Sequence, residues 1–308
     1  ASTVGVTTYD TAVAAANIID GSTDLATDTI VAGALSGTTT FSLVTKTPGV
    51  ESVGTATFNI AGRIKQGGLI QLVFTEDNDM PATPTVAFTS PGGADTPTVA
   101  AKAWDQTTST LLITTGGVDI AAGATVTFTV QAVRSPSSVN GGASTIAVTT
   151  YDTAVNANNV IDGATNLATD TIVAGVLGGA KTFALATTTP GVESVATVTF
   201  DVAGQIKTGG KIEVVLARDN EMIAAPVIAF TAPAGGNAPT VAQRAWDQTT
   251  TTLLVTTGGR ARSGGAAETA AVPAARHSTR DACGWYRLAM GCLNVTAQIT
   301  SATSGVPY

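Results

Sequence analysis

Hydrophobic and polar residues alternate at the start of the chain, where Ser2–Asp10 reads STVGVTTYD. A period of two is typical of a β-strand that buries one face. Leu69–Phe74 (LIQLVF) is almost continuously apolar, which predicts a central strand, and glycine pairs such as Gly67-Gly68 predict turns. Residues 11–36 show no clear alternation, and a short helix or an additional hairpin remains open there. Elsewhere in the first 133 residues the pattern predicts strands at 3–8, 39–45, 52–60, 69–75, 85–89, 98–104, 110–115 and 124–133.

The opening strand pattern returns as STIAVTTYD at Ser144–Asp152, 142 positions later. Residues 2–117 align with residues 144–259 without a gap, and 76 of the 116 aligned positions are identical. Many differences exchange one apolar residue for another, as at Ile113 and Val255, which preserves apolar volume in a core. An internal repeat of this kind predicts two modules with the same fold.

Many short strands separated by regular turn signals predict an antiparallel β-sandwich of immunoglobulin-like type. We therefore expect an all-β chain of two tandem immunoglobulin-like modules. The first module is expected at residues 1–134 and the second at residues 144–308. The linker, residues 135–143, contains Pro and Gly, which end the preceding strand. Because the linker is short, it limits how far the two modules can separate.

The repeat is interrupted near the C-terminus by a segment of foreign composition. Val295–Ile299 (VTAQI) is similar to the last strand of the first module, so we expect residues 260–288 to be an insertion in the loop before that strand. This segment contains the only histidine, His277, and five of the nine arginines. Cys283 and Cys292 are candidates for a disulfide in an oxidising compartment, with free thiols as the other state. A local error in the reading frame is the alternative explanation of the composition.

Composition narrows the classes of function. Charged residues make up 12% of the chain and the net charge is −7, whereas nucleic-acid binding requires a basic surface. The apolar runs are shorter than the ~20 residues of a membrane-spanning helix. A single histidine without a repeated partner is a poor general base, and the two cysteines lack the spacing of a zinc site. We therefore expect no nucleic-acid partner, no membrane span, no enzyme activity, no metal and no cofactor.

Other polar and aromatic positions offer ligands, but each has a simpler structural explanation. Acidic residues in Asp20–Asp28 and Glu76–Asp79 could bind calcium; they lack EF-hand spacing, and turn residues that cap strand ends are the favoured interpretation. Trp104 and its repeat Trp246 could stack on a sugar, although a tryptophan in a strand is more typical of a sandwich core. Asn294 begins the only N-glycosylation sequon, NVT.

Three segments of the first module, TATFNI, IKQGGLIQLVF and STLLITTGGVDIAAGATVTFTVQAV, resemble tandem immunoglobulin-like modules of extracellular surface and filament proteins. The resemblance covers both repeats apart from the expected insertion, and it concerns architecture. The chain also looks like the subunits of pilus-like fibrils that assemble by donor-strand exchange. In such fibrils a terminal strand of one subunit completes the sandwich of another. The resemblance implies an extracellular location and a role in structure or adhesion.

We therefore expect a structural subunit of an extracellular, pilus-like fibre, at the cell surface or in a filament, whose partner is another copy of itself. The low content of Lys and Arg fits a secreted or surface protein, and the start Ala-Ser-Thr is expected for a processed chain. A carbohydrate-binding adhesin or a surface-layer module, with surface glycans as partners, is the alternative.

The donor strand is expected at residues 2–9, because only the second copy of this strand has a neighbour upstream in its own chain. A donated strand adds main-chain hydrogen bonds to a sheet edge, and its alternate side chains fill pockets. The apolar donor positions Val4 and Val6 would be the buried ones. The residues expected in the donor strand and in its equivalent within the chain are Val4, Val6, Thr8 and Tyr9, and Ile146, Val148 and Tyr151, respectively.

Overall fold

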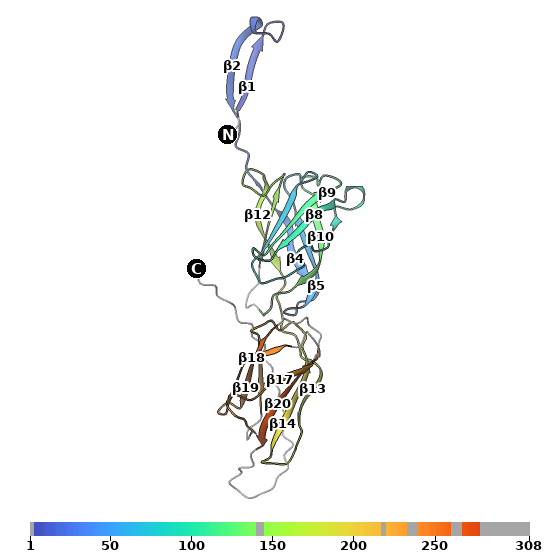
Figure 1. Ribbon diagram of the computed structural model, residues 1–308. Coiled ribbons are helices and arrows are strands. Elements are labelled where there is room, and N and C mark those ends of the chain that lie inside the picture. Colours follow the sequence, from blue (N-terminus) through green and yellow to red (C-terminus); the bar gives the residue numbers. More distant parts are fainter. Residues whose placement is uncertain (1–2, 140–144, 217–219, 233–238, 260–266, 278–308) are drawn as a thin grey trace.

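The computed structural model confirms an all-β fold of tandem β-sandwich modules (Figure 1). Apart from the strands, its regular structure consists of single-turn 3-10 helices at Ala15–Asn17 and Gly93–Asp95. Among the described residues, no helix has the length and apolar character to cross a membrane. The structure describes residues 3–139, 145–216, 220–232, 239–259 and 267–277.

The first module is a sandwich of two layers. One layer has the strand order β7-β10-β5-β4 and the other β12-β11-β6-β9-β8, and a short parallel pairing of β4 with β12 joins them. The short β3 pairs with β12. The strands are β3 (Gly33–Ala34), β4 (Ser36–Leu43), β5 (Glu51–Asn59), β6 (Leu69–Phe74), β7 (Val86–Ser90), β8 (Thr98–Asp105), β9 (Thr110–Gly116), β10 (Thr125–Arg134), β11 (Thr145–Tyr151) and β12 (Val160–Thr169).

Aromatic side chains join the two layers in the core of the first module. Phe41 on β4 lies edge-on to Phe74 on β6, with ring centroids 5.3 Å apart. Phe74 in turn meets Trp104 on β8 at 5.4 Å, also edge-on. Such pairs add to the stability that burial of the rings provides. The near-continuous apolar pattern of β6 therefore marks a central strand, as its sequence predicts.

Among the residues that the structure describes, the second module repeats these strands except for β3, β11 and β12. Its layers have the orders β13-β14-β20-β16, with β17 also paired to β20, and β15-β19-β18. Each strand pair copies a pair of the first module, as β15-β19 copies β6-β9. Within the described residues, no strand takes the places that β11 and β12 have in the first module. The strands are β13 (Gly178–Leu185), β14 (Glu193–Asp201), β15 (Lys211–Val215), β16 (Asn220–Glu221), β17 (Ala229–Ala232), β18 (Thr240–Asp247), β19 (Thr252–Gly258) and β20 (Ala267–His277).

Strand β20 corrects the expectation of an inserted loop at residues 260–288. Thr269 of β20 lies opposite Thr199 of β14, as Thr127 of β10 lies opposite Thr57 of β5, so the two strand pairs have the same register. The backbone repeat therefore continues beyond the point where residue similarity ends. Similarity of residue types did not locate this strand, because its hydrogen bonds to β14 are formed by the main chain and do not require the same side chains. The expected counterpart, residues 295–299, lies outside the described residues.

Residues 3–26 form a separate antiparallel hairpin of β1 (Thr3–Tyr9) and β2 (Ile18–Ala26), which stands clear of the first module (Figure 1). In the described structure, each of its strands pairs only with the other. This hairpin, with a 3-10 turn at its tip, settles the interpretation left open for residues 11–36. The repeated opening strand is thus one half of a hairpin.

The hairpin of the second repeat, β11–β12, belongs to the first module. The sequence repeat places a module boundary in residues 135–143, but β11 pairs with β6 and β12 with β4. The sheet of the first module therefore extends to residue 169. The correction has a simple physical reason: a repeat of residues defines where a pattern begins again, whereas a module ends where its hydrogen-bonded sheet and core end.

Candidate assembly site

The inserted hairpin β11–β12 fills the gap between β6 and β4. Strand β11 pairs antiparallel with β6 in a continuous register from Ile146 opposite Phe74 to Tyr151 opposite Leu69. The end of β12 pairs parallel with β4, with Ala168 opposite Thr40. The hairpin thus hydrogen-bonds to the two strands that would otherwise be the edges of the two layers. It completes the sandwich of the first module.

Apolar side chains of the inserted hairpin become part of the core. Val148 on β11 and Leu167 on β12 are fully buried, and Ile146 is 3% exposed. Ile172, just beyond β12, is 5% exposed and belongs to the same core cluster. Burying side chains of this size contributes about 1.5–3 kcal/mol each. The hairpin is therefore an integral part of the first module's core.

A buried carboxylate fixes the position of the hairpin. Asp162 on β12 is fully buried, and its carboxylate accepts hydrogen bonds from the hydroxyl of Thr150 at 2.8 Å and from the backbone N–H groups of Ala61 and Gly62 at 3.1 and 3.2 Å. These donors satisfy a group that would be costly to bury alone. The hydroxyl of Tyr151 donates to Gln71 Oε1 at 2.9 Å.

A second carboxylate holds the end of the inserted segment. Asp170 accepts a hydrogen bond from the backbone N–H of Leu43 at 2.8 Å and forms an ion pair with Lys46 at 2.8 Å. Burial acts to raise the pKa of Asp170, but the hydrogen bonds from Lys46 and from Leu43 outweigh it, so that the pKa is lowered from its ordinary value. The carboxylate of Asp170 is therefore charged at neutral pH, and its contacts with Leu43 and Lys46 form what we call the Asp170 clamp.

The free hairpin β1–β2 has the same internal geometry as the inserted one. Thr3 pairs with Ala26 and Val6 with Thr23, as Thr145 pairs with Ala168 and Val148 with Thr165. The hydroxyl of Thr8 donates to Asp20 at 2.7 Å, which repeats the Thr150–Asp162 contact. The free hairpin is therefore already folded with the same register as the inserted one.

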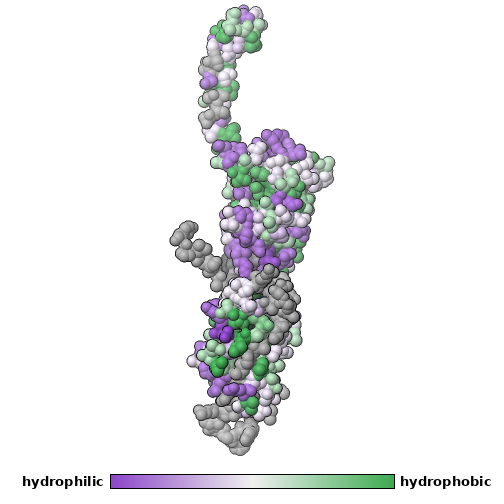
Figure 2. Space-filling view, viewed as in Figure 1, coloured by the Kyte–Doolittle hydropathy of each residue, from purple (hydrophilic) through white to green (hydrophobic). Residues whose placement is uncertain are grey.

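The free hairpin differs from the inserted one in burial. Val6 is 43% exposed, whereas its equivalent Val148 is fully buried. Leu25 is half exposed, and Ile30, which follows β2, is 90% exposed against 5% for Ile172. Figure 2 shows the hairpin standing clear of the first module, with hydrophobic residues along it. Apolar side chains that are core residues in one copy are thus surface residues in the other.

The residues expected for the donor strand lie together on β1. Val4 and Val6 are exposed, as are Thr8 and, in part, Tyr9. In the internal equivalent, Ile146, Val148 and Tyr151 are buried. The expected Cys283–Cys292 disulfide and the sequon at Asn294 lie outside the described residues.

The sequence analysis did not identify the second strand of the free hairpin, with its carboxylate and the apolar residues beyond it, as part of the candidate site. Asp20 and Asp162, Leu25 and Leu167, and Ile30 and Ile172 are identical pairs between the repeats. The repeated segment LATDTIVAG was visible in the sequence and was the available signal. The strand at residues 2–9 is easier to recognise from the sequence, because its apolar residues alternate, than the following strand, which is rich in Asp, Gly and Thr.

Both repeated tryptophans are core residues. Trp104 and Trp246 are 6% and 7% exposed, and their indole N–H groups donate to Gln106 and Gln248 at 2.8 and 2.7 Å. This confirms the interpretation as sandwich core and removes both rings as platforms for a sugar. Among the described residues, no cluster of three His, Cys, Asp or Glu side chains could hold a metal ion.

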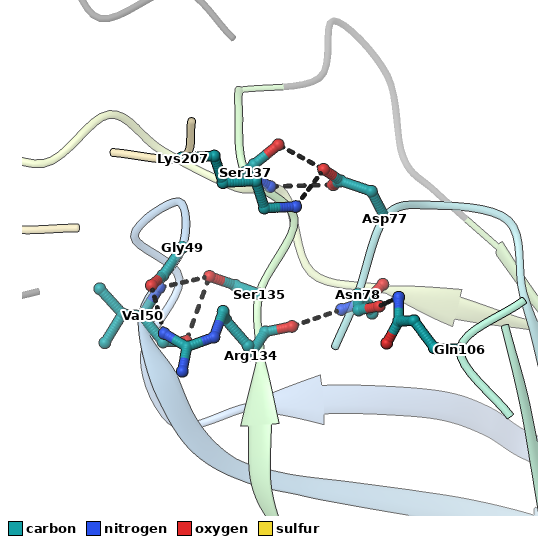
Figure 3. A network of polar contacts seen from close by, with 9 residues as sticks. All are labelled: Gly49, Val50, Asp77, Asn78, Gln106, Arg134, Ser135, Ser137 and Lys207. Atoms are coloured by element: carbon teal, nitrogen blue, oxygen red, sulfur yellow. Dashed lines mark hydrogen bonds and ion pairs between the residues drawn. The ribbon is translucent and has the colours of Figure 1, made fainter. Parts of the chain in front are cut away.

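A polar network lies where the chain leaves β10, at the base of the first module (Figure 3). Asp77 accepts hydrogen bonds from the backbone N–H and the hydroxyl of Ser137, and Lys207 of the second module forms a 2.8 Å ion pair with it. Burial acts to raise the pKa of Asp77, but the bonds from Lys207 and Ser137 outweigh it and lower the pKa. The network ties the linker and the second module to the base of the first.

The same network fixes the end of β10. The side-chain amide of Asn78 donates to the carbonyl oxygen of Arg134 at 3.1 Å, and the side-chain amide of Gln106 donates to the carbonyl oxygen of Asn78 at 3.2 Å (Figure 3). The guanidinium of Arg134 donates to the carbonyl oxygen of Gly49 at 3.2 Å and pairs with Glu51 at 3.3 Å. The segment that follows β10 therefore leaves this strand in a defined direction.

No protein-family model and no curated protein matches this sequence. Solved structures similar to the chain include the serine-rich repeat adhesion glycoprotein Srr1 from Streptococcus agalactiae (10% identity, 80% of this chain and 89% of that chain, TM-score 0.28). The C-terminal domain of the antigen I/II-family protein AspA from Streptococcus pyogenes is another (8%, 79% and 88%, 0.27). A type II cohesin dyad from the ScaA scaffoldin of Acetivibrio cellulolyticus is a third (13%, 77% and 83%, 0.23). Similarity at these TM-scores carries no argument about function, so the architecture rests on the strand pairing itself.

Proposed function

We propose that this protein is a structural subunit of an extracellular, pilus-like fibre and that its copies associate by donating the N-terminal hairpin β1–β2. The observation that supports the proposal best is the insertion of β11–β12 into the first module. That hairpin has nearly the same sequence and the same register as β1–β2. What β11–β12 does within the chain, β1–β2 does between chains.

The exposed apolar side chains of the free hairpin provide the driving force for association. Val4, Val6, Leu25 and Ile30 are between 43% and 90% exposed, and their burial in a receiving module contributes on the order of 4–8 kcal/mol before the entropic cost of association. Main-chain hydrogen bonds to a sheet edge add to this. Since the hairpin is already in its final register, little additional ordering is required.

A hairpin given to a different surface of another copy is a heterologous contact. Such contacts extend into an open filament unless the rotation between copies closes a ring. The scarcity of charged residues, 12% of the chain, fits a protein whose main chemistry is the pairing of threonine- and valine-rich strands. The extracellular location belongs to the proposal and is supported by this composition.

Deletion of residues 1–31 tests the proposal. We expect the full chain to form linear assemblies, seen by negative-stain electron microscopy and by light scattering after gel filtration, and the shortened chain to remain monomeric. Val6→Asp should have the same effect, because the position equivalent to Val6 is fully buried in the inserted hairpin. Val13→Asp is the matched control, since its equivalent Val155 stays 44% exposed there. Assemblies formed by the shortened chain would refute the proposal.

A further inference from the structure

Among the described residues, the second module has open edges at the two strands that correspond to the ones receiving the hairpin in the first module. Strand β6 pairs with β11 and β9, whereas its equivalent β15 pairs only with β19 among the described strands. Strand β4 pairs with β12 and β5, whereas the pairing described for its equivalent β13 is with β14 alone. In the part of the chain that the structure describes, the second module is thus a sandwich without the two strands that complete the first.

We propose that this open slot, between β13 and β15, is the binding site for the hairpin β1–β2 of a second copy of the chain. The inference rests on the proposed function, and it names the surface that receives the donor. Transferring the register of the first module by 142 positions places Val4 opposite Leu216, Val6 opposite Val214 and Thr8 opposite Ile212. The second strand of the donor then meets β13, with Ala26 opposite Thr182.

The backbone of β15 is oriented to receive a strand. The N–H of Leu216 donates to the carbonyl oxygen of Thr251 next to β19. Because N–H groups along a strand point alternately to the two sides, those of Glu213 and Val215 point away from β19, into the open slot. They have the positions of Gln71 and Val73, which lie beside β11 in the first module. A hairpin in the slot would satisfy them.

The side chains at the edges of the slot are less buried than their equivalents in the completed module. Phe41 and Leu43 on β4 are 2% and 6% exposed, whereas Phe183 and Leu185 on β13 are only partly buried. Leu177 is also partly buried, whereas its equivalent Leu35 is buried. The apolar side chains of a donated hairpin would cover these residues, as Val148 and Leu167 do in the first module.

The polar contacts that fix the inserted hairpin have partners in the slot. Ala203 and Gly204 are identical to Ala61 and Gly62, whose N–H groups bond the buried Asp162. No described residue accepts a hydrogen bond from the N–H groups of Ala203 and Gly204. The carbonyl oxygen of Pro48 in the first module lies against Gly204, where Ile161 of the inserted hairpin lies against Gly62 in the completed module. The carboxylate of Asp20 would accept from both N–H groups once that loop of the first module moves aside.

The hydroxyl of Tyr9, the equivalent of Tyr151, would meet Glu213 in place of Gln71. Its O–H would therefore donate to a carboxylate, and hydrogen bonds to charged groups are the stronger kind.

A mixing experiment with two complementary variants tests the site. Val215→Pro removes an N–H group that faces the slot and leaves the bonds between β15 and β19 in place, so the second module should keep its fold. Deletion of residues 1–31 leaves the slot but removes the donor. We expect each variant alone to be monomeric by light scattering. Mixed together, they should form a 1:1 heterodimer, because one offers only a hairpin and the other only a slot.

The outcomes of these experiments distinguish failure of the proposed binding site from failure of the proposed function. If the full chain assembles but Val215→Pro assembles equally well, the hairpin binds elsewhere and the site is refuted, while the fibre proposal stands. If the full chain does not assemble at all, the fibre proposal fails with it. Glu213→Pro, which removes the other N–H group facing the slot, is a second variant, and circular dichroism and thermal melts check that both variants fold.

Discussion

At the scale of single residues, the protein contains the same side chains in two environments. Val6 and Val148 have the same place in their hairpins, but only Val148 lies in a core. Asp20 and Asp162 accept hydrogen bonds from equivalent threonines, but only Asp162 is buried and bonded to a neighbouring loop. The contribution of these residues to stability therefore depends on whether their hairpin is inserted in a module or exposed to solvent.

Substitution of the two valines should show this difference. Val148→Ala removes buried methyl groups and should lower the free energy of unfolding by about 2 kcal/mol. Val6→Ala should change it by less than about 0.5 kcal/mol in a monomer, because the side chain is exposed. Urea unfolding in the Val215→Pro background keeps assembly out of the measurement. Equal losses for the two substitutions would contradict the description of the free hairpin.

The Asp170 clamp makes a prediction about pH. Its folded pKa lies below the ordinary value of 3.8, so the charged carboxylate adds stability above that value and loses this contribution as the pH falls through the folded pKa. Asp170→Asn should remove this contribution. We therefore expect urea midpoints of the parent chain to fall more steeply than those of the variant as the pH drops below 4. Parallel pH profiles would count against the clamp.

At the scale of elements, the sequence predicts strands well and their partners poorly. The alternation located β1 and β4 to β10 of the first module to within a few residues, since period-two burial is a local property of each strand. It did not reveal that β11 pairs with β6, because that contact joins residues far apart in sequence. The last strand, β20, was missed because its residue types differ from those of β10 while its register is kept.

The same logic explains what the sequence could predict of the candidate site. Val4 and Val6 can be identified from the sequence because they alternate with small and polar residues and recur as Ile146 and Val148. Asp20 could not be identified as a site residue, because an aspartate before Gly-Ser-Thr is equally typical of a turn. Its role depends on the loop at Ala61–Gly62, which reaches the equivalent Asp162 only in the folded module.

Equivalent strands at the centre and at the edge of a sheet should respond differently to proline. Val73→Pro on β6 removes an N–H that faces β11 inside a completed sheet, and we expect a loss of about 2 kcal/mol or more in the stability of the first module. Val215→Pro on β15 should change the stability of the monomer by much less, since β15 is an edge there. Thermal melts followed by circular dichroism compare the two. A larger loss for Val215→Pro would contradict the open edge.

At the scale of the whole molecule, the hairpin β1–β2 lies at one end and the second module, whose described strands leave two edges unpaired, at the other (Figure 1). The ion pair between Lys207 and Asp77 connects the two modules. Each copy can then give one hairpin and receive one, which is the arrangement of a linear polymer. In the proposed fibre, the pairing of β11–β12 with the first module within one chain is the model for the pairing of β1–β2 with the second module of another copy.

Disulfide trapping tests this central claim most directly. Val6 and Val214 correspond to Val148 and Leu72, directly opposite residues on β11 and β6 whose spacing suits a disulfide. In a chain with Val6→Cys and Val214→Cys, and with Cys283→Ser and Cys292→Ser, mild oxidation should give a ladder of covalent multimers on a non-reducing gel. Reduction should return it to monomer, and neither single-cysteine chain should form a ladder. A doubly substituted chain that assembles yet stays monomeric on the oxidised gel would contradict the donation of β1–β2 to the second module.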